Sequence, residues 1–483
     1  MTVDRTRTGS TARRRRPRVL LVTALLVVTV GAAPVAADDA RSRRGDDGRL
    51  TDPTTTPSIV YEVDESTLPF EPLDGHEDSR REWGVLAGAG YRIEIPAEWN
   101  GDLVLWAHGF RGTETRLYFQ EEEVPFREWL LDNGYAWAAS TYSKNDYNVG
   151  TAVTDTRVLA WKFGRVADRR PDLTFIAGAS MGGHVAAASI ERHPRAYDGA
   201  LPVCGVVGDF ELFDFFLDFN VTAQQLALGR SGFPVGPDYA TTTAPEIKDA
   251  LEAAPGTWPL LLNERGRAFK QLVELRTGGD RPNFDEAWIF WNSFPEFGSG
   301  IPGNFLFDLG TGDGTVGERD KVAVDNTDVF YETDLVPGPS NDLEIDLNAD
   351  VARVAKERLS RVNTPASPSP HLTGRIRVPV LTMHNLGDLF VPFHMETTYA
   401  ETVAARGNAD LLVQRAIRGV GHCDFTTAEY ERAMTDLVAW VEDGVKPEGD
   451  AVSDPAAVAA DDFGCRFTDL NTPAGHLLPA PCP

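Results

Sequence analysis

Positive charge and cysteine are both scarce in this chain. Its 483 residues include 46 Lys and Arg against 72 Asp and Glu, a formal net charge of −26. A nucleic-acid partner needs a basic face to neutralise phosphates, so this balance argues against one. The four cysteines lack the Cys and His spacing of a zinc site, and we expect neither a metal nor another cofactor.

An apolar run near the N-terminus is too short for a membrane span. Val19 to Ala33 follow the basic stretch "RRRRPR" and precede small residues at Val35 and Ala37, whereas a span needs about 20 apolar residues. The pattern predicts a signal peptide over residues 1–37, cleaved after Ala37, and a secreted protein without stable membrane insertion. A retained anchor is the alternative, and the export route stays open. Residues 38–57 are polar and predict a flexible linker.

Strand-like and helix-like segments alternate over residues 58–208. The apolar runs "DLVLWAHGF", "YAWAASTYS", "LTFIAGA" and "GALPVCGVVG" have strand length, and helical patterns lie between them. The alternation resumes over residues 373–445, where Thr426 and Glu429 fit a capping box before the last helix. This order predicts an α/β fold with a mostly parallel, doubly wound sheet.

Residues 209–372 break the alternation and predict a mainly helical insertion. They include the aromatic segment "DFELFDFFLDF", helical pieces such as "NADVARVAKERL", and glycine- and proline-rich loops. The aromatic segment predicts a core for the insertion and, as a second reading, a substrate-pocket wall with Phe210 and Phe213 facing the substrate. The loop "DLGTGDGT" lacks the order of a calcium loop and predicts turns. Residues 446–483 predict an extended C-terminal surface segment.

A serine stands between an expected strand and an expected helix in the pattern G-x-S-x-G. Gly178 and Gly182 flank Ser180, and glycines relieve backbone clashes in a sharp strand-to-helix turn. Such a turn lifts the serine hydroxyl above the sheet edge, at a helix N-terminus that favours negative charge. An incidental serine in a glycine-rich turn is the bland alternative. The pattern predicts that Ser180 is a nucleophile.

An acid and a histidine follow the serine on two later loops. Asp388 lies in "HNLGDLFVP" after the expected strand "VPVLTM", and His422 lies in "GVGHCDF" after "LLVQRAI". His422 is expected to take the serine proton, and Asp388 to orient the imidazole. Asp209, directly after another strand, is the rival acid. With the elbow around Ser180, this order makes the sequence resemble the α/β-hydrolase family.

The resemblance implies further site residues. It places an oxyanion hole at the backbone N–H groups of Met181 and of Phe110, the latter within a "HGF" segment in which His108 is structural. Phe110 is also an expected substrate contact. The segment departs from the family's HGGG form. The resemblance also makes residues 209–372 a cap or lid over the site.

Four cysteines in an exported protein suggest two disulfides, with three possible connectivities. Tannase-like hydrolases join a cysteine beside the serine to one beside the histidine, and this resemblance implies a Cys204–Cys423 bond. Ala179 precedes the serine here, so that motif itself is absent, and buried free thiols are the alternative. Cys465 and Cys482 would then pair and hold the tail.

Taken together, these features predict a secreted serine hydrolase that cleaves carboxylic esters through an acyl-enzyme intermediate. The substrate is a small-molecule or polymer ester, with uncharged apolar esters preferred because the insertion is aromatic and the chain is acidic. An exported serine peptidase or amidase of the same fold is one alternative. A non-catalytic binding protein on a hydrolase scaffold is another. The sequence does not indicate the oligomeric state.

Overall fold

The computed structural model describes residues 59–293, 303–335, 338–364, 367–472 and 475–483. The expected signal peptide and linker, residues 1–57, lie outside these ranges. Within the described ranges, no helix combines the length and the apolar character needed to cross a bilayer.

One eight-stranded sheet forms the centre of the molecule, in the order β10-β9-β8-β7-β4-β6-β3-β2. Neighbours from β10 to β6 run parallel, and β3 runs antiparallel to both β6 and β2. The strands are β2 (Arg80–Leu86), β3 (Ala89–Ile95), β4 (Leu103–Ala107), β6 (Ala136–Ser140), β7 (Thr174–Ala179), β8 (Gly199–Val203), β9 (Val380–Asn385) and β10 (Leu412–Ile417). A short parallel pair, β1 (Glu62–Val63) and β5 (Arg116–Leu117), lies apart from this sheet. The predicted mostly parallel α/β sheet is confirmed.

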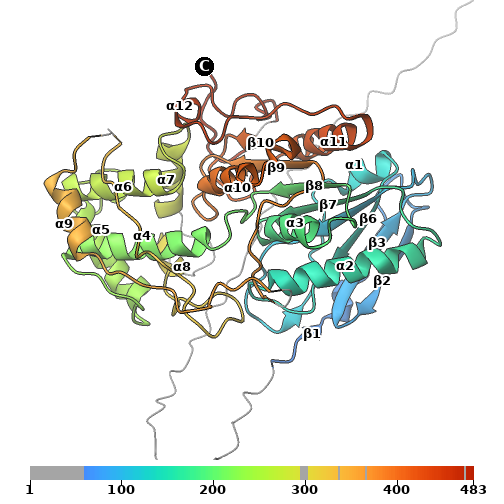
Figure 1. The fold of residues 1–483 in the computed structure, drawn as a ribbon, viewed down its shortest axis with the longest axis horizontal. Coiled ribbons are helices and arrows are strands. Elements are labelled where there is room, and N and C mark those ends of the chain that lie inside the picture. The colour runs from blue at the N-terminus through green and yellow to red at the C-terminus, as the bar shows by residue number, and fades with distance from the viewer. Residues whose placement is uncertain (1–58, 294–302, 336–337, 365–366, 473–474) are drawn as a thin grey trace, which may run out of the picture.

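Helices cover both faces of the sheet (Figure 1). Side chains alternate along β4, so that Leu103 and Leu105 belong to one buried cluster and Val104 and Trp106 to the other. A strand buried on both faces must be apolar throughout, which explains the unbroken apolar runs in the sequence. The first cluster includes side chains of α2 (Val149–Val166), α3 (Met181–Arg192) and α10 (His394–Ala404), and the second those of α1 (Arg127–Asp132) and α11 (Thr427–Asp443).

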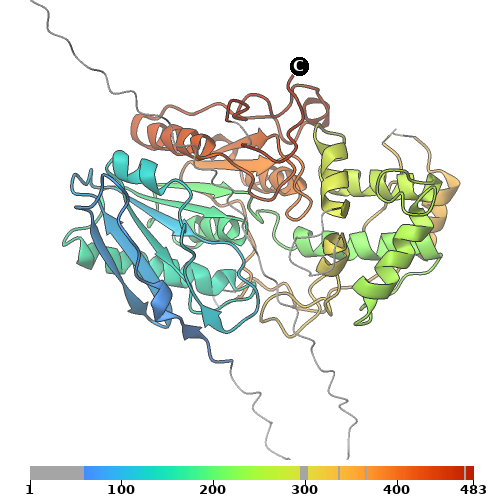
Figure 2. The same ribbon diagram turned by 180° about the vertical axis from the view of Figure 1, so that it is seen from behind.

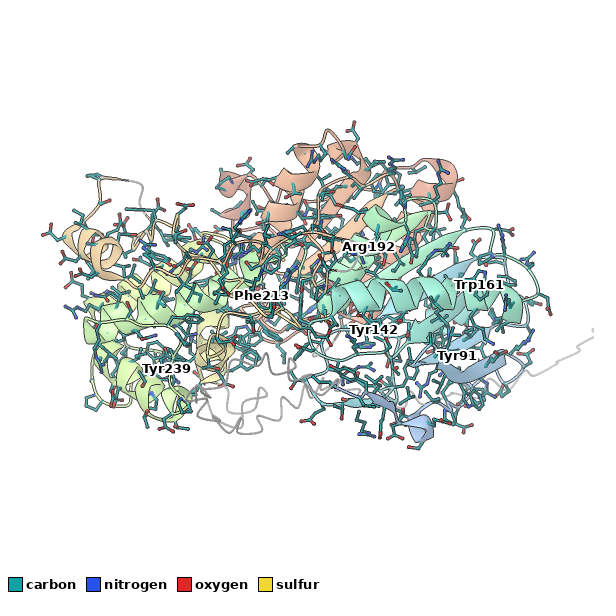
Figure 3. All side chains as sticks on the ribbon, turned by 60° about the horizontal axis from the view of Figure 1, so that its bottom comes forward. Tyr91, Tyr142, Trp161, Arg192, Phe213 and Tyr239 are labelled. Carbon is teal, nitrogen blue, oxygen red and sulfur yellow. A yellow bond between two sulfur atoms is a disulfide. The ribbon has the colours of Figure 1, made fainter. Side chains whose placement is uncertain are left out.

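The chain between β8 and β9 forms a helical lobe beside the sheet (Figure 2). Figure 3 shows Phe213 where this lobe meets the sheet domain and Tyr239 within the lobe. The lobe contains α4 (Glu211–Leu228), a π-helical turn (Tyr239–Thr243), α5 (Ala244–Leu251), α6 (Glu264–Arg276), α7 (Phe284–Ser293), α8 (Phe305–Leu309) and α9 (Asp342–Asp350). The remaining helical elements are α12 (Pro455–Val458) and the 3₁₀ turns Glu65–Thr67 and Ala409–Leu411.

The helix predicted over "NADVARVAKERL" is wrong beyond its first residues, because α9 ends at Asp350. Val351 is extended, with φ −64° and ψ 140°. The backbone N–H of Val354 donates to Asn326 Oδ1 at 2.7 Å, and the guanidinium of Arg353 donates to the Asn326 carbonyl at 3.0 Å. These distant polar partners outweigh the local helical tendency.

The tail from residue 446 packs more closely than predicted. Val452, Val458 and Phe463 are buried against Leu386 and Phe393 of the segment that follows β9. The prediction of a surface segment is therefore wrong for this part of the tail, because its few apolar residues find a shared cluster.

Candidate active site

Ser180 occupies a sharp turn between β7 and α3. Its φ and ψ are 60° and −123°, a strained conformation for a residue with a side chain. A Cβ on Gly182 would lie 2.0 Å from the carbonyl oxygen of Ala107, and one on Gly178 would lie 2.3 Å from that of Gly182. Only glycine therefore fits at either position, and the backbone N–H of Ser180 is held by the Val203 carbonyl at 3.1 Å.

Asp388 and His422 lie on the loops that follow β9 and β10 and contact each other directly. Asp388 Oδ2 is 2.6 Å from His422 Nδ1. Asp388 Oδ1 accepts the N–H groups of Phe390 at 2.9 Å and Val391 at 3.0 Å. The Asp388 side chain has no exposed surface, and 9% of the His422 side chain is exposed. The two backbone N–H groups fix the Asp388 carboxylate so that it orients the imidazole.

The two loops and the serine turn all lie at the carboxyl edge of the sheet. In the sheet order, β4 lies between β6 and β7, and the antiparallel strand β3 lies next to the edge strand β2. The strained Ser180 follows the central strand β7. The chain has the α/β-hydrolase fold. In this fold, a nucleophile after the central strand and an acid and a histidine after two later strands form one site.

His422 Nε2, the ring nitrogen that would face the nucleophile, lies 3.5 Å from Cys423 Sγ. Among the described residues, no hydrogen bond joins Ser180 Oγ to this ring. Catalytic hydrogen bonds are often long without substrate and shorten when it binds. The scaffold connects the two segments in another way, because β7 pairs with β8, and Cys204, directly after β8, is bonded covalently to the His422 loop.

That covalent link is the disulfide between Cys204 and Cys423, with Cα atoms 5.2 Å apart. Cys204 directly follows β8, and its N–H donates to the Met383 carbonyl at 2.7 Å. The structure thus contains the pairing that the resemblance implied. The second disulfide joins Cys465 and Cys482 within the tail.

The expected oxyanion donors belong to the residue after Ser180 and to the loop that follows β4. Met181 is the first residue of α3, where an N–H has no carbonyl four residues earlier in the helix. The loop after β4 approaches the serine closely, because a Cβ on Gly109 would lie 3.2 Å from Ser180 Cβ. Phe110 is the next residue of that loop. Two N–H groups beside one nucleophile can stabilise a negatively charged oxygen.

His108 braces the same loop, as predicted. Its Nδ1 is 2.7 Å from the Gly109 carbonyl oxygen, and its ring stacks on Tyr142 at 4.0 Å between centroids. The Tyr142 hydroxyl donates to the His108 carbonyl at 3.1 Å. Burial and the charge of Arg111 lower the pKa of His108 well below its usual range. A neutral, buried ring suits a structural role.

Asp209, the rival acid, faces other histidines. Its Oδ2 lies 3.2 Å from His371 Nδ1 and accepts the Leu372 N–H at 2.8 Å, and its Oδ1 lies 3.2 Å from His184 Nε2. Burial alone would raise the pKa of Asp209, but its interactions with His184 and His371 outweigh burial and lower that pKa. Asp209 therefore belongs to a buried network behind the nucleophile helix, and the structure brings Asp388, not Asp209, to His422.

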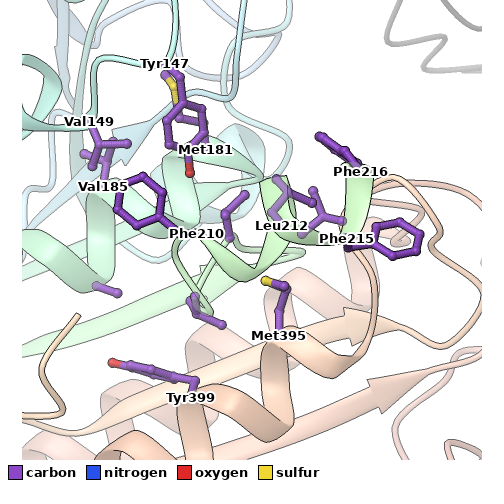
Figure 4. Close-up of a cluster of buried hydrophobic side chains, with 14 of the residues drawn as sticks. Tyr147, Val149, Met181, Val185, Phe210, Leu212, Phe215, Phe216, Met395 and Tyr399 are labelled. Atoms are coloured by element: carbon purple, nitrogen blue, oxygen red, sulfur yellow. The ribbon is translucent and has the colours of Figure 1, made fainter. Parts of the chain in front are cut away.

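The two phenylalanines expected to bind substrate lie in different surroundings. Phe210 is 3% exposed and packs with Val185 and Met181 in the cluster of Figure 4. Phe213 is half-buried and packs edge-to-face on Tyr147, with centroids 4.9 Å apart. Phe210 thus lies in the core beneath the site, and Phe213 retains some exposed surface.

The aromatic side chain that contacts His422 is one that sequence reasoning missed. Phe390 packs edge-to-face on the imidazole, with centroids 5.0 Å apart. Phe305 of α8 and Phe216 of α4 pack on Phe390 at 5.1 and 6.3 Å. We refer to Phe216, Phe305 and Phe390 as the aromatic wall. In the sequence, the feature that could have indicated this contact is the position of Phe390, two residues after Asp388.

Two further features of the described chain are a cavity and a group of side chains with metal-ligand spacing. A cavity of about 770 Å³ lies between α6, α7 and the C-terminal tail, and it is lined by none of Ser180, Asp388 and His422. Among the described residues, the one group of His, Cys and acidic side chains with metal-ligand spacing is Cys204, His422 and Cys423. Its two sulfurs are bonded to each other, and metal binding needs free thiolates.

Comparison with known proteins gives distant relatives. No model of a known protein family matches the chain. An o-phthalyl amidase of Xanthobacter agilis is 26% identical over 430 residues, which are 80% of this chain and 92% of that protein. The crystal structure of feruloyl esterase B from Aspergillus oryzae aligns with 76% of this chain and 81% of its own, at 14% identity and a TM-score of 0.44. An acylaminoacyl peptidase of Pyrococcus horikoshii aligns with 71% of this chain and 37% of its own, at 10% identity and a TM-score of 0.35.

Proposed function

We propose that this protein is a secreted serine hydrolase that cleaves carboxylic esters. The observation that carries the proposal is the buried Asp388–His422 pair at 2.6 Å, with the His422 loop tied by a disulfide to the end of the strand beside that of the strained Ser180. Only a histidine held in one tautomer acts efficiently as a base toward a serine hydroxyl.

The reaction follows from these positions. His422 Nε2 takes the Ser180 proton as Oγ attacks the ester carbonyl, and Asp388 stabilises the imidazolium. The N–H groups of Met181 and Phe110 bind the oxyanion. The imidazolium then gives its proton to the departing alcohol, which leaves an acyl group on Ser180. A water activated by His422 releases the acid.

The aromatic wall supports uncharged, apolar substrates. Phe390 touches His422, and Phe216 and Phe305 extend the apolar surface into the helical lobe. Burial of an acyl or aryl group against such a surface stabilises the complex by about 25 cal/mol per Å². We propose that the lobe, residues 209–372, acts as the cap that selects the substrate.

Ser180→Ala tests the proposal. We expect hydrolysis of p-nitrophenyl butyrate to fall by about 10⁴- to 10⁶-fold, because triad members act as a unit. Ser189→Ala on the same helix is the matched control, since Ser189 is also buried but lies away from the turn. More than a few per cent of residual activity in the Ser180 variant would remove the nucleophile assignment.

Amide cleavage is a second candidate, which the amidase relative favours. His422 can protonate a leaving nitrogen as well as an alcohol. An o-phthalyl group carries a carboxylate, and Arg111, next to Phe110, already forms an ion pair with Glu123. We therefore expect a neutral benzoyl ester to give a higher kcat/KM than an o-phthalyl amide. The reverse order would establish the amidase assignment.

Export is part of the proposal. Two disulfides fit an oxidising compartment, where such bonds form and persist. N-terminal sequencing of protein recovered from the medium of an exporting host should begin at Asp38. A mature chain that keeps residues 1–37 would favour a retained anchor.

A further inference from the structure

One indole contacts both loops that carry Asp388 and His422. Nε1–H of Trp291 donates to the Gly387 carbonyl at 2.9 Å and to the Val420 carbonyl at 2.8 Å. Gly387 directly precedes Asp388, and Val420 lies two residues before His422. Trp291 belongs to α7, in the helical lobe, and is 2% exposed. A side chain of the lobe therefore reaches across to the sheet and bridges the two loops.

The loops are packed tightly at this bridge. The N–H of Gly387 donates to the Gly419 carbonyl at 2.9 Å. A Cβ on Gly387 would lie 2.8 Å from that carbonyl oxygen and 3.0 Å from the side chain of Ala287, on the same helix as Trp291. The helix, the acid loop and the histidine loop thus meet at one point with no spare volume. A shift of either loop would move Asp388 relative to His422.

We infer that Trp291 is a positioning residue, whose N–H holds the acid loop and the histidine loop in register. The inference rests on the proposed serine hydrolase function. Its physical basis is that proton transfer depends steeply on the placement of the base. Without the indole N–H, two buried carbonyls lose their shared donor, and the loops relax to satisfy them elsewhere. The helical lobe therefore contributes to catalysis through this contact as well as through the aromatic wall.

The test compares Trp291→Phe with Trp288→Phe. Trp288 lies on the same helix, is 1% exposed, and donates its own Nε1–H to the Pro259 carbonyl at 3.2 Å, within the lobe. Both variants lose a buried indole donor, so both should lose stability. We expect Trp291→Phe to lower kcat by about 10- to 100-fold, as for misplaced catalytic groups, with KM within about twofold. Trp288→Phe should keep kcat within about twofold of the wild type.

A spectroscopic readout separates positioning from general damage. The proton shared by His422 Nδ1 and Asp388 should give a downfield proton NMR signal, because the bond is short. The signal should broaden or move upfield in Trp291→Phe and stay in place in Trp288→Phe. If Trp291→Phe does not fold, benzothienylalanine at position 291, which replaces only the N–H by sulfur, serves as the second variant.

The outcomes are distinct. Wild-type kcat together with an unmoved NMR signal in the position 291 variant overturns the inference, as does an equal kcat loss in the Trp288 variant. Failure of the proposed function would show in the wild type, as absence of Ser180-dependent turnover. In that case the NMR comparison still decides whether Trp291 holds the two loops.

Discussion

At the scale of single residues, the candidate site is a concentration of backbone strain. Ser180, Cys204, Asp209 and Cys423 all have positive φ angles, between 44° and 60°. Such conformations cost about 1–3 kcal/mol each and persist only where the surroundings enforce them. Here a glycine-lined turn, a disulfide and a buried hydrogen-bond network do so. Strain at Ser180, Cys204 and Cys423, which the β7–β8 pairing and one disulfide link, indicates a site whose geometry is fixed before substrate arrives.

Gly182→Ala should prevent the serine turn from forming. The added Cβ would lie 2.0 Å from the Ala107 carbonyl oxygen, and neither backbone can move without displacing β4 or α3. We expect a loss of stability of about 3 kcal/mol or more, at the upper end for overpacked sites, together with loss of activity. Thermal unfolding measures the first effect. Gly236→Ala, where nothing lies within 4 Å of the added Cβ, should unfold like the wild type.

Asp388→Asn should lower kcat by about 10⁴-fold, because the amide favours the wrong tautomer of His422. Asp209→Asn should lower kcat far less and act mainly on stability, since Asp209 faces His184 and His371. Kinetics on a neutral aryl ester measure both. If the Asp209 variant shows the larger loss of kcat, the acid role moves to that residue.

The sequence was informative about residues that a local motif surrounds. Ser180 stands in a glycine pattern, and Asp388 and His422 each follow an apolar strand, so all three could be named in advance. Trp291 and Phe390 could not be assigned their contacts, because these depend on how α7 and α8 pack on loops far away in the chain. The local sequence around an aromatic residue in a helical lobe does not indicate which backbone carbonyl that residue contacts.

At the scale of elements, prediction succeeded where burial on both faces imposes an apolar run. The central strands β4, β6, β7, β8 and β9 are such cases. Prediction failed after Asp350, because a hydrogen bond to a side chain of the preceding loop holds the backbone in a non-helical conformation. It also failed for part of the tail, where three separated apolar residues join a cluster with residues that follow β9, which no periodicity reveals.

The two disulfides should differ in their effect on catalysis. Replacing Cys204 and Cys423 by Ala should lower stability by about 2–4 kcal/mol, as for other long-loop disulfides. It should also lower kcat, because the His422 loop loses its link to β8. Replacing Cys465 and Cys482, a bond that spans 17 residues in the tail, is the matched control and should leave kcat nearly unchanged. Chemical denaturation and ester kinetics on both double variants measure this. An equal kcat for the two would show that the Cys204–Cys423 bond is structural only.

At the scale of the whole molecule, three groups, Asp424, Glu274 and His476, should contribute more to stability in mild acid than at neutral pH. Burial raises the pKa of Asp424 to about 6 and that of Glu274 to about 7. Burial would lower the pKa of His476, but its bond to Glu429 raises it. All three groups bind protons more tightly in the folded state, so their contribution is present at low pH. It is lost as pH rises through about 6 for Asp424 and about 7 for Glu274, and that of His476 is lost as pH rises through its raised pKa. The net charge of −26 adds repulsion in the same direction.

Glu274→Gln should raise the melting temperature at pH 8 and change it little at pH 5. Glu274 is 7% exposed, and its raised pKa means that ionisation costs on the order of 3 kcal/mol in the folded state. Glutamine removes that cost and keeps the shape. Differential scanning calorimetry at the two pH values measures the effect. Glu401→Gln, at an exposed position on α10, is the control and should shift neither value. A gain at pH 5 equal to that at pH 8 would contradict this explanation.

The central claim, that Ser180 is an activated nucleophile, is tested most directly by covalent labelling. A fluorophosphonate reacts with a serine whose proton a histidine removes, and peptide mapping by mass spectrometry locates the adduct. We predict stoichiometric labelling of the wild type on the peptide that contains Ser180, none in Ser180→Ala, and greatly slowed labelling in Asp388→Asn. Labelling at another residue, or none in a folded wild-type protein, would contradict the account.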